Sequence, residues 1–253
     1  GLVAGTYICT VTDNNGCVAT TTEVLQAPAA VTSSVAATSA FTTVQISCYG
    51  LSDGEATATA GGGVGGGVAA NYTYLWDDAA AQTTAVATGL VAGTYTCVVT
   101  DANSCPMTST SVTLNQSAAI GATSSQSDNN GYAVSCNGGS DGTATAVGAN
   151  GSGGYTYAWD DLNSQTTAAA TGLVAGTYIC TVTDNNGCIA TTQEILQAPA
   201  IVTSSAAVSL TYNGSHISCN GLSDGEATVT PGGGVGGYTY LWDDPAPAQT
   251  TAV

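Results

Sequence analysis

Short segments in which hydrophobic and polar residues alternate run along the whole chain. In the segment 94–100, Tyr95, Cys97 and Val99 occupy every second position, and the residues between them are mostly threonine. Successive side chains of a β-strand point to opposite faces of a sheet, so this period of two predicts a strand with one face in a core and one largely in water. The segments end at Gly, Asn, Asp or Pro and lack a sustained helical period. The pattern predicts an all-β protein.

One copy of this pattern, residues 30–117, contains about seven such segments, the number typical of an immunoglobulin-like β-sandwich of roughly 85 residues. The expected strands are residues 31–36, 43–48, 55–60, 72–77, 83–88, 94–100 and 108–114. In such a fold two antiparallel sheets pack face to face around a single core. Each copy is therefore expected to form its own small domain.

The chain contains internal repeats. The string Gly-Leu-Val-Ala-Gly-Thr-Tyr begins at Gly1, Gly89 and Gly172, which gives periods of 88 and 83 residues. The same two spacings separate three cysteines, Cys48, Cys136 and Cys219. Periods of this length indicate small domains in series.

The repeat register predicts the domain boundaries. We expect residues 1–29 to be the C-terminal part of one repeat and residues 201–253 the N-terminal part of another. Between them, residues 30–117 and 118–200 are expected to be complete repeats. Because both ends fall inside a repeat, we also expect the parent chain to continue in both directions.

Composition excludes several kinds of partner. The chain has no Lys and no Arg, and its 17 Asp and Glu give a formal charge of -17. Nucleic acids are held largely by cationic side chains, so they are excluded as partners, and an anionic membrane surface is disfavoured for the same reason. The sequence has no apolar run long enough to predict a membrane span. Such an acidic chain with few charges indicates a specialised surface material.

Nine cysteines recur at matching places in the copies, and no Cys-x-x-Cys pair occurs. In an oxidising compartment this spacing predicts a disulfide framework, so we expect a secreted or cell-surface protein. Domains rich in Ala, Thr and Gly bury little apolar area, and disulfides compensate for a small core.

Aromatic residues mark the expected core. Leu90-Val91-Ala92-Gly93-Thr94-Tyr95 resembles a tyrosine corner, in which a tyrosine hydroxyl donates to the backbone a few residues upstream. The equivalent residues in the other copies are Tyr7 and Tyr178. One tryptophan per copy supplies the largest hydrophobic side chain, and we expect a structural role for Trp76, Trp159 and Trp242.

Two glycine-rich segments, residues 61–67 and 232–237, are interpreted as loops between strands. A phosphate-binding loop would need a following Lys and a helix, and the sequence offers neither.

Four motifs occur in fixed order within one copy. They are Ser-Cys-Asn-Gly-Gly-Ser-Asp-Gly-Thr-Ala-Thr (135–145), Gly-Gly-Tyr-Thr-Tyr-Ala-Trp (153–159), Gly-Leu-Val-Ala-Gly-Thr-Tyr (172–178) and Thr-Asp-Asn-Asn-Gly-Cys (183–188). Together they resemble the SprB-type repeat, which forms long tandem arrays in cell-surface adhesins and gliding-motility proteins of gliding bacteria. The resemblance covers essentially the whole chain. It implies a secreted or surface-anchored array with an adhesive or scaffolding function and no catalytic residues.

The cysteines of one copy allow two pairings. If the strand ends that carry them meet, Cys48 would bridge Cys105, and the same pairing would join Cys136 to Cys188 in the next copy. A Tyr two residues before a cysteine also fits an immunoglobulin-like bridge from Cys48 to Cys97. The resemblance favours the first pairing, which would stabilise a copy by about 4 kcal/mol. The equivalent positions in the incomplete copies are Cys17 and Cys219.

The first pairing leaves one cysteine per copy without an assigned partner. These are Cys9, Cys97 and Cys180, at a position where the resemblance implies an apolar residue. Each would be a buried thiol or a link to a neighbouring repeat or chain.

Recurring aspartates are candidate calcium ligands. They lie in Ser-Asp-Gly and Trp-Asp-Asp motifs, at Asp53, Asp141, Asp224, Asp77, Asp78, Asp160, Asp161, Asp243 and Asp244. Ca²⁺ takes several carboxylate and carbonyl oxygens. The alternative is that each aspartate caps its own turn. The sequence has no EF-hand spacing, and it indicates no other cofactor.

Asn-x-Ser/Thr sequons occur at Asn71, Asn115, Asn150 and Asn213. They are candidate glycosylation sites, although such sequons also arise by chance in a chain this rich in Ser and Thr.

The sequence predicts a structural or adhesive array that forms a stalk, surface fibre or filament. Its expected partners are neighbouring repeats and other copies of the chain. The alternative is a module that binds glycans or another surface, with or without calcium, through loops that differ between copies. An enzyme is not expected, since no Ser, His and Asp set recurs and no cation could stabilise an oxyanion.

Overall fold

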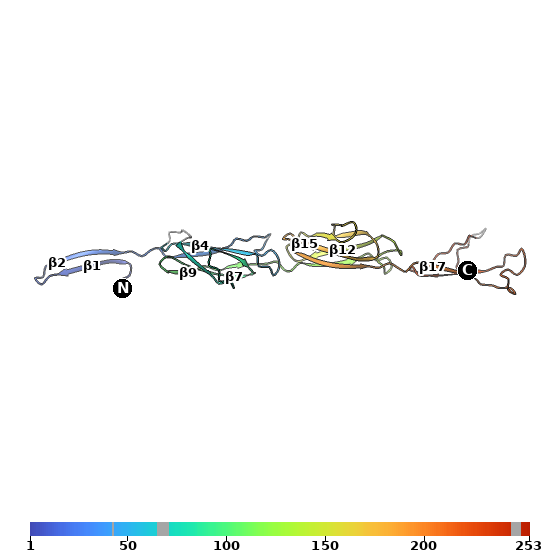
Figure 1. Ribbon diagram of the computed structural model, residues 1–253, viewed down its shortest axis with the longest axis horizontal. Coiled ribbons are helices and arrows are strands. Elements are labelled where there is room, and N and C mark those ends of the chain that lie inside the picture. The colour runs from blue at the N-terminus through green and yellow to red at the C-terminus, as the bar shows by residue number, and fades with distance from the viewer. Residues whose placement is uncertain (42, 65–70, 244–248) are drawn as a thin grey trace. The chain divides into compact units, whose positions relative to one another are not determined.

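The computed structural model describes residues 1–41, 43–64, 71–243 and 249–253, so Asp244 and residues 65–67 of the first glycine-rich segment lie outside the described residues. The chain divides into two compact units, Gly1–Ala119 and Ile120–Val253. Within the described ranges every regular element is a β-strand (Figure 1). The all-β prediction is confirmed. In the described parts of the chain, no helix is long and apolar enough to cross a membrane.

Unit 1 contains ten strands joined by antiparallel pairing. They are β1 (Gly5–Thr12), β2 (Val18–Leu25), β3 (Thr32–Ala37), β4 (Gly54–Gly61), β5 (Thr73–Trp76), β6 (Val86–Leu90), β7 (Gly93–Tyr95), β8 (Cys97–Thr100), β9 (Pro106–Thr108) and β10 (Val112–Leu114). The sheets have the strand orders β1-β2, β3-β4-β6, β5-β8-β9 and β10-β7. The hairpin β1-β2 belongs to the incomplete first copy, and the other three sheets form the first complete copy.

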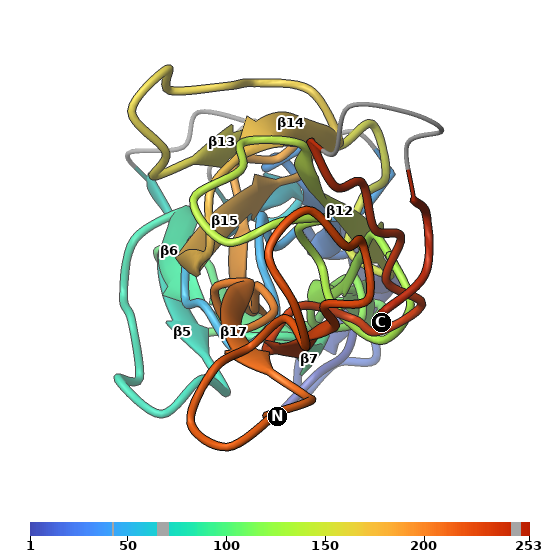
Figure 2. The same ribbon diagram turned by 90° about the vertical axis from the view of Figure 1, so that its right-hand side faces the viewer.

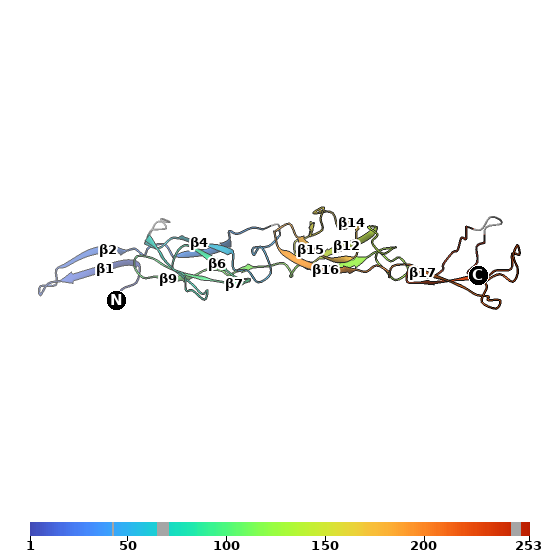
Figure 3. The same cartoon turned by 45° about the vertical axis from the view of Figure 1, so that its right-hand side comes forward.

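Unit 2 repeats this arrangement with eight strands. They are β11 (Gly121–Gln126), β12 (Gly142–Ala149), β13 (Thr156–Trp159), β14 (Ala169–Leu173), β15 (Gly176–Thr183), β16 (Ile189–Leu196), β17 (Thr203–Val208) and β18 (Ala227–Gly232). The sheets β11-β12-β14 and β13-β15-β16 enclose one core, and β17-β18 belongs to the following copy. The labelled strands of both layers can be followed in Figures 2 and 3.

Alternation along the strands builds the cores. In β12, Ala144 and Ala146 are buried while the residues between them face outward. From the other sheet, Trp159, Cys180 and Val182 pack against these alanines. Alanine positions in the sheet leave room for one large side chain, and Trp159 is the largest buried side chain of this core. The fold class is therefore the predicted tandem immunoglobulin-like β-sandwich.

The tyrosine corner is present in both complete copies. The Tyr95 hydroxyl donates to the Val91 carbonyl at 2.9 Å, and the Tyr178 hydroxyl donates to the Val174 carbonyl at 3.0 Å. A side chain at Gly176 would touch the Tyr178 ring, since its Cβ would lie 3.6 Å from the ring and hydroxyl atoms. The Tyr178 ring therefore packs over the backbone of Gly176 at an ordinary van der Waals distance.

Replacing Tyr178 by phenylalanine is expected to lower the free energy of unfolding by about 1 kcal/mol, because the substitution removes this hydrogen bond and keeps the ring. Urea unfolding followed by circular dichroism measures the change. The matched control is Tyr49→Phe, at a tyrosine that is 61% exposed, where a change below about 0.5 kcal/mol is expected. Equal losses in the two variants would contradict a structural role for the corner.

Three of the predicted strands are interrupted. Residues 43–48 form only isolated bridges, in which Phe41 pairs with Val44 and Ile46 with Gln116. The prediction of a continuous strand there is wrong, because the Ser47 N–H donates to the Asp53 carboxylate (3.1 Å) instead of to a neighbouring strand.

The other two interruptions have the same cause. Segment 94–100 breaks at Thr96, whose N–H donates to Asp77 Oδ1 at 2.8 Å. Segment 108–114 breaks at Ser109, whose hydroxyl accepts the Cys97 N–H at 2.9 Å. In each case a side-chain oxygen replaces a backbone partner.

The two compact units each group one complete copy with part of another copy. The repeat boundaries within them, at residues 29/30, 117/118 and 200/201, stay predictions.

Candidate functional site

The most elaborate polar structure in each complete copy is a turn organised by one buried aspartate. In unit 2 this residue is Asp184, which is 5% exposed. Its carboxylate accepts backbone N–H groups from Ser152 (2.8 Å), Asn186 (2.9 Å) and Cys188 (3.0 Å). Ser152 lies in the loop after β12, so this carboxylate ties the cysteine-bearing turn to that loop.

Unit 1 has the same arrangement. Asp101 accepts the N–H groups of Val64 (2.9 Å), Asn103 (3.0 Å) and Cys105 (2.9 Å). In the β1-β2 hairpin, Asp13 makes the local contacts with Asn15 (2.9 Å) and Cys17 (2.8 Å) and is exposed. We call this element the aspartate turn, residues 13–17, 101–105 and 184–188.

The hydrogen bonds set the charge state of these carboxylates. Burial raises the pKa of Asp184, but the hydrogen bonds from the N–H groups of Ser152, Cys188 and Asn186 lower it by more. The pKa of Asp184 is therefore below its usual range. Hydrogen bonds from Val64 and Cys105 lower the pKa of Asp101 in the same way. Both groups are therefore anions that accept backbone donors at neutral pH.

The opposite end of each copy carries the Ser-Cys segment and its Ser-Asp-Gly motif. The Ser135 N–H donates to Asp141 Oδ1 at 3.0 Å, and the Ser47 and Ser218 N–H groups donate to their aspartates at 3.1 Å. A Cβ at Gly142 would lie 2.8 Å from both the Leu173 carbonyl oxygen and the Leu196 side chain. This close approach explains the glycine after the aspartate, and it holds the Ser-Cys segment against the core.

The predicted disulfides Cys48–Cys105 and Cys136–Cys188 are wrong. Ile46 donates to the Asn115 carbonyl, beside the β7 residue Gly93, whereas Cys105 adjoins β9 at the far end of β8. Strand geometry separates these ends by roughly 20 Å, and a disulfide requires Cα atoms within about 7 Å. The cysteines therefore lie at opposite ends of one sandwich.

Unit 2 repeats this separation. Val134 donates to Gln197, which follows the end of β16, and Cys188 precedes the beginning of that strand. Cys48 and Cys188 are disulfide-bonded, and the other cysteines are thiols, namely Cys9, Cys17, Cys97, Cys105, Cys136, Cys180 and Cys219. The alternative bridge from Cys48 to Cys97 is also wrong, since Cys97 is a thiol.

The third cysteine of each complete copy is a core residue. Cys97 and Cys180 are fully buried, and burial raises the pKa of both thiols. Both properties make these thiols unreactive in the folded state. Cys9, on the β1-β2 hairpin, is exposed.

The aspartates expected to hold calcium accept hydrogen bonds from the protein itself. Asp53, Asp141 and Asp224 accept from serines six residues earlier. Asp78 and Asp161 accept backbone N–H groups within their own turns. Asp77 and Asp160 accept the backbone N–H groups of Thr96 and Ile179, 19 residues further along the chain. Asp243 is exposed. Across the described residues, no three His, Cys, Asp or Glu side chains gather where a metal ion could sit. Calcium binding stays a prediction.

The four sequon asparagines, Asn71, Asn115, Asn150 and Asn213, are all exposed. Their glycosylation stays a prediction.

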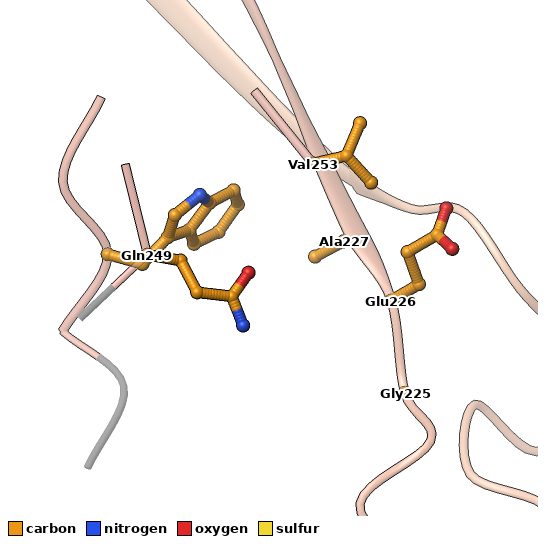
Figure 4. Close-up of a pocket in the computed structure, with 6 residues that line it drawn as sticks. Gly225, Glu226, Ala227, Gln249 and Val253 are labelled. Atoms are coloured by element: carbon orange, nitrogen blue, oxygen red, sulfur yellow. The ribbon is translucent and has the colours of Figure 1, made fainter. Parts of the chain in front are cut away.

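A hollow in the last copy is lined by Gly225, Ala227, Trp242 and Val253, among others (Figure 4). The Trp242 indole donates to the Thr251 carbonyl at 3.0 Å, as the Trp159 indole donates to Thr167 at 3.1 Å in the complete copy. There the equivalent Trp159 is buried in the core between the two sheets. The hollow therefore surrounds a side chain that is a core residue in the complete copy.

Sequence reasoning missed the importance of Asp101 and Asp184. The available signal was an aspartate four residues before a cysteine in three of the copies, at Asp13, Asp101 and Asp184. The long-range partners of Asp101 and Asp184 are Val64 and Ser152. They cannot be identified from the sequence, because the position of the loop after β4 or β12 must first be known.

The fold and these turns define a class of protein, a tandem array of immunoglobulin-like domains. The SprB repeat family matches residues 40–81, 134–164 and 211–247, one segment in each of three successive copies. The resemblance to the SprB repeat found in the sequence is confirmed at these three segments. None of the curated proteins compared with the chain matches it.

Three solved structures are similar at low identity. The N-terminal domains of the bacteriophage RB49 highly immunogenic outer capsid protein match at 15% identity, with 87% of this chain and 79% of that chain covered and a TM-score of 0.39. A tetra-tandem repeat from the extending region of a large adhesion protein matches at 15% identity (91% and 64% covered, TM-score 0.27). A C-terminal intimin fragment, solved with its receptor's binding domain, matches at 12% identity (79% and 59% covered, TM-score 0.26). This chain thus spans less than two thirds of the latter two.

Proposed function

We propose that this chain is a non-catalytic, load-bearing part of an extracellular adhesin, in which serial repeats form a stalk or surface fibre. The match to SprB repeats supports the adhesin-like role. The observation that carries the mechanical role is the position of the first and last strands in a complete copy.

The backbone enters and leaves a complete copy at opposite ends. Ile120, just before β11, lies beside Gly151 in the loop that holds the aspartate turn. The last strand, β16, ends at Leu196, next to the Ser-Cys segment at the other end. Tension applied through the chain therefore acts along the strands.

With this geometry, tension along the chain applies a shear force to the hydrogen bonds between the terminal strands and their neighbours. β11 pairs with β12 over six residues, and β16 pairs with β15 over eight. The terminal strands also touch, since the Ser124 hydroxyl lies 3.0 Å from the Thr192 hydroxyl and donates to the Gln193 carbonyl at 3.2 Å. A pull along the strands must break many of these bonds together, which favours slow unfolding under load.

Single-molecule force spectroscopy on the whole chain, in reducing buffer, tests the proposal. Each complete copy is expected to unfold in one step that releases about 280 Å of contour length. Smooth extension without such steps would contradict a load-bearing role. A matched variant, Ser124→Ala, removes contacts between β11 and β16 and is expected to lower the unfolding force of its copy alone.

A further inference from the structure

The β1-β2 hairpin shows to solvent a face that is buried in a complete copy. Its equivalent in unit 2 is the pair β15 and β16, whose residues lie 171 positions further along the chain (176 minus 5). Val11 is 62% exposed, whereas its equivalent Val182 is fully buried. Leu25 is exposed as well, and its equivalent Leu196 is a buried core residue. The hairpin therefore presents the apolar side chains with which a complete copy covers its opposite sheet.

The last copy, built on β17 and β18, shows the other half of the same core. Trp242 lines the hollow in Figure 4 together with Ala227, and it lines a second hollow with Val229. In the first complete copy, the equivalent residues Trp76 and Ala56 belong to one buried cluster with residues of β8. Trp242 and Ala227 are only partly buried. The core face of the last copy is therefore incompletely covered.

A backbone hydrogen bond closes the Ser-Cys end of a complete copy. In unit 2, Val134 is fully buried, and its N–H donates at 3.1 Å to the carbonyl of Gln197, directly after β16. In the last copy the equivalent of Val134 is Ile217, which is 45% exposed. The equivalent of Gln197 is Gln26, directly after β2. The last copy thus carries the donor of this bond and the hairpin carries the acceptor.

The loop at the other end of the last copy has the conformation that binds an aspartate turn. The Gly234 N–H donates to the Ala200 carbonyl at 2.9 Å, as the Gly63 N–H donates to the Ala29 carbonyl at 2.9 Å in the first complete copy. Gly234 and Gly63 also share a positive φ, of 61° and 58°. The two loops therefore have the same local structure.

The hairpin has the aspartate that such a loop binds. In the first complete copy, Asp101 accepts the Val64 N–H at 2.9 Å, and its carboxylate fills the space beside Gly63. In the last copy, a groove of about 440 Å³ lies beside Val235, the equivalent of Val64. Asp13, the equivalent of Asp101, is exposed in the hairpin turn. The last copy thus provides the donor and the groove, and the hairpin provides the carboxylate.

We infer that the β1-β2 hairpin of one chain docks on the last copy of a second chain and completes its sandwich. The joint repeats the contacts within a complete copy, and it pairs Asp13 with Val235, Gln26 with Ile217, and Val11 and Leu25 with Trp242. Successive chains are thereby joined head to tail. The inference rests on the proposed fibre-forming role, which it extends from repeats within one chain to contacts between chains.

Apolar burial and backbone hydrogen bonds stabilise this joint, and charge opposes it. Asp13 and Glu23 lie on the hairpin, Asp224 and Glu226 lie on the last copy, and the chain has no Lys or Arg. Repulsion between exposed like charges is screened by salt, so association is expected to strengthen as the ionic strength rises from about 0.05 to 0.5 M. Dissociation by salt would contradict a joint of this kind.

Sedimentation velocity of the whole chain over a range of concentrations tests the inference. Reducing buffer prevents oligomers that are linked through exposed cysteines. The expected result is a mass that rises with concentration from one chain through two, three and more, since each added chain brings both surfaces. A chain that remains monomeric at about 1 mM would overturn the inference.

Val11→Asp tests the apolar face of the hairpin, and Ile8→Asp is its matched control. Both residues are exposed in the hairpin, so neither substitution removes a buried contact within the chain. The joint buries Val11, and Val11→Asp is expected to weaken association at least about tenfold, because an unpaired charge is costly to bury. The equivalent of Ile8 is Ile179, which is 42% exposed in the complete copy. Ile8→Asp is therefore expected to change the association constant by less than about twofold, and equal effects would overturn the inference.

A mixture of two blocked chains tests the head-to-tail direction. Val11→Asp leaves the last copy intact, and Val229→Asp leaves the hairpin intact. Each variant alone is expected to be monomeric, and their mixture is expected to form a dimer that does not grow further. This outcome does not depend on the folding of the last copy in Val229→Asp, because that chain contributes only its hairpin. A mixture that remains monomeric would overturn the inference, as would dimers of either variant alone.

The thiol of Cys9 reports on the joint directly. Cys9 is exposed, whereas its equivalent Cys180 is fully buried. In the assembled chain, the rate of Cys9 alkylation is expected to fall at least about tenfold relative to the dilute chain, because a buried thiol is inert. Cys105 is exposed in a complete copy, so its rate is expected to stay unchanged. Unchanged labelling of Cys9 in the assembled chain would overturn the inference.

These results are independent of the force measurement that tests the load-bearing role. A chain that unfolds in steps under force but stays monomeric in solution would contradict head-to-tail docking and leave the load-bearing proposal standing. A chain that assembles as expected but extends smoothly under force would do the reverse.

Discussion

Replacing Trp159 by alanine is expected to lower the free energy of unfolding of its copy by about 4 kcal/mol. The indole is 4% exposed and donates to the Thr167 carbonyl at 3.1 Å. Its neighbours in the core are small, including Ala144, Ala146 and Cys180, so they cannot close the space that the indole leaves. Urea unfolding followed by circular dichroism measures the change.

Two further variants distinguish the stability that is lost with a buried side chain from the stability that is lost with any aromatic residue. Trp159→Phe keeps most of the volume and is expected to cost less than half as much. Trp242→Ala removes the equivalent side chain where it is only partly covered, and a loss below about 2 kcal/mol is expected. Similar losses for Trp159→Ala and Trp242→Ala would contradict the view that one indole fills the core between the two sheets.

The parts of the fold that the sequence predicts well are those that depend on local pattern. Segment 55–60 alternates alanine with polar residues, segment 72–77 has aromatic residues at every second position, and β4 and β5 form where expected. The tyrosine corner was also predictable, because its hydrogen bond spans only four residues, from Tyr95 to Val91. Period and local chemistry are sufficient for such elements.

The parts that were mispredicted depend on which strand ends meet. The hypothesis of a Cys48–Cys105 bond assumed that two particular strand ends lie together, and alternation carries no information on that point. In the structure, Ile46 donates to Asn115, which follows the end of β10, while Cys105 adjoins β9 at the other end of the sandwich. Which cysteines lie close together therefore depends on the order of the strands in the sheets, a long-range property that the local pattern does not contain.

The same limitation applies to the candidate calcium ligands. Their recurrence in every copy suggested a shared site, but recurrence also follows when each copy needs the same turn. Asp141 and Asp161 each bind donors within six residues along the chain. Such short-range bonding produces the same sequence pattern as a shared metal site, so the spacing could not distinguish the two.

Replacing Asp184 by alanine is expected to destabilise its copy by about 3 kcal/mol, because three backbone N–H groups lose a charged acceptor in a partly buried turn. Chemical unfolding at neutral pH measures the loss. Asp13→Ala is the matched control, since Asp13 makes the two local contacts but is exposed, and a change below about 1 kcal/mol is expected. Equal effects would mean that the contact with Ser152 contributes little.

The pH dependence of stability gives this prediction a second, independent measurement. The pKa of Asp184 is lower in the folded chain than the usual value of about 3.9, so the unfolded chain binds a proton more readily. Its contribution is therefore fully present above about pH 5 and is lost as the pH falls through 4 and below. The melting temperature of the parent chain should fall over that window, and Asp184→Ala should show a smaller fall. If Asp184→Ala retained the full acid sensitivity, other carboxylates, such as Asp161, would be responsible for the pH dependence of stability. The aspartate turn would then not be what stabilises this end of the sandwich.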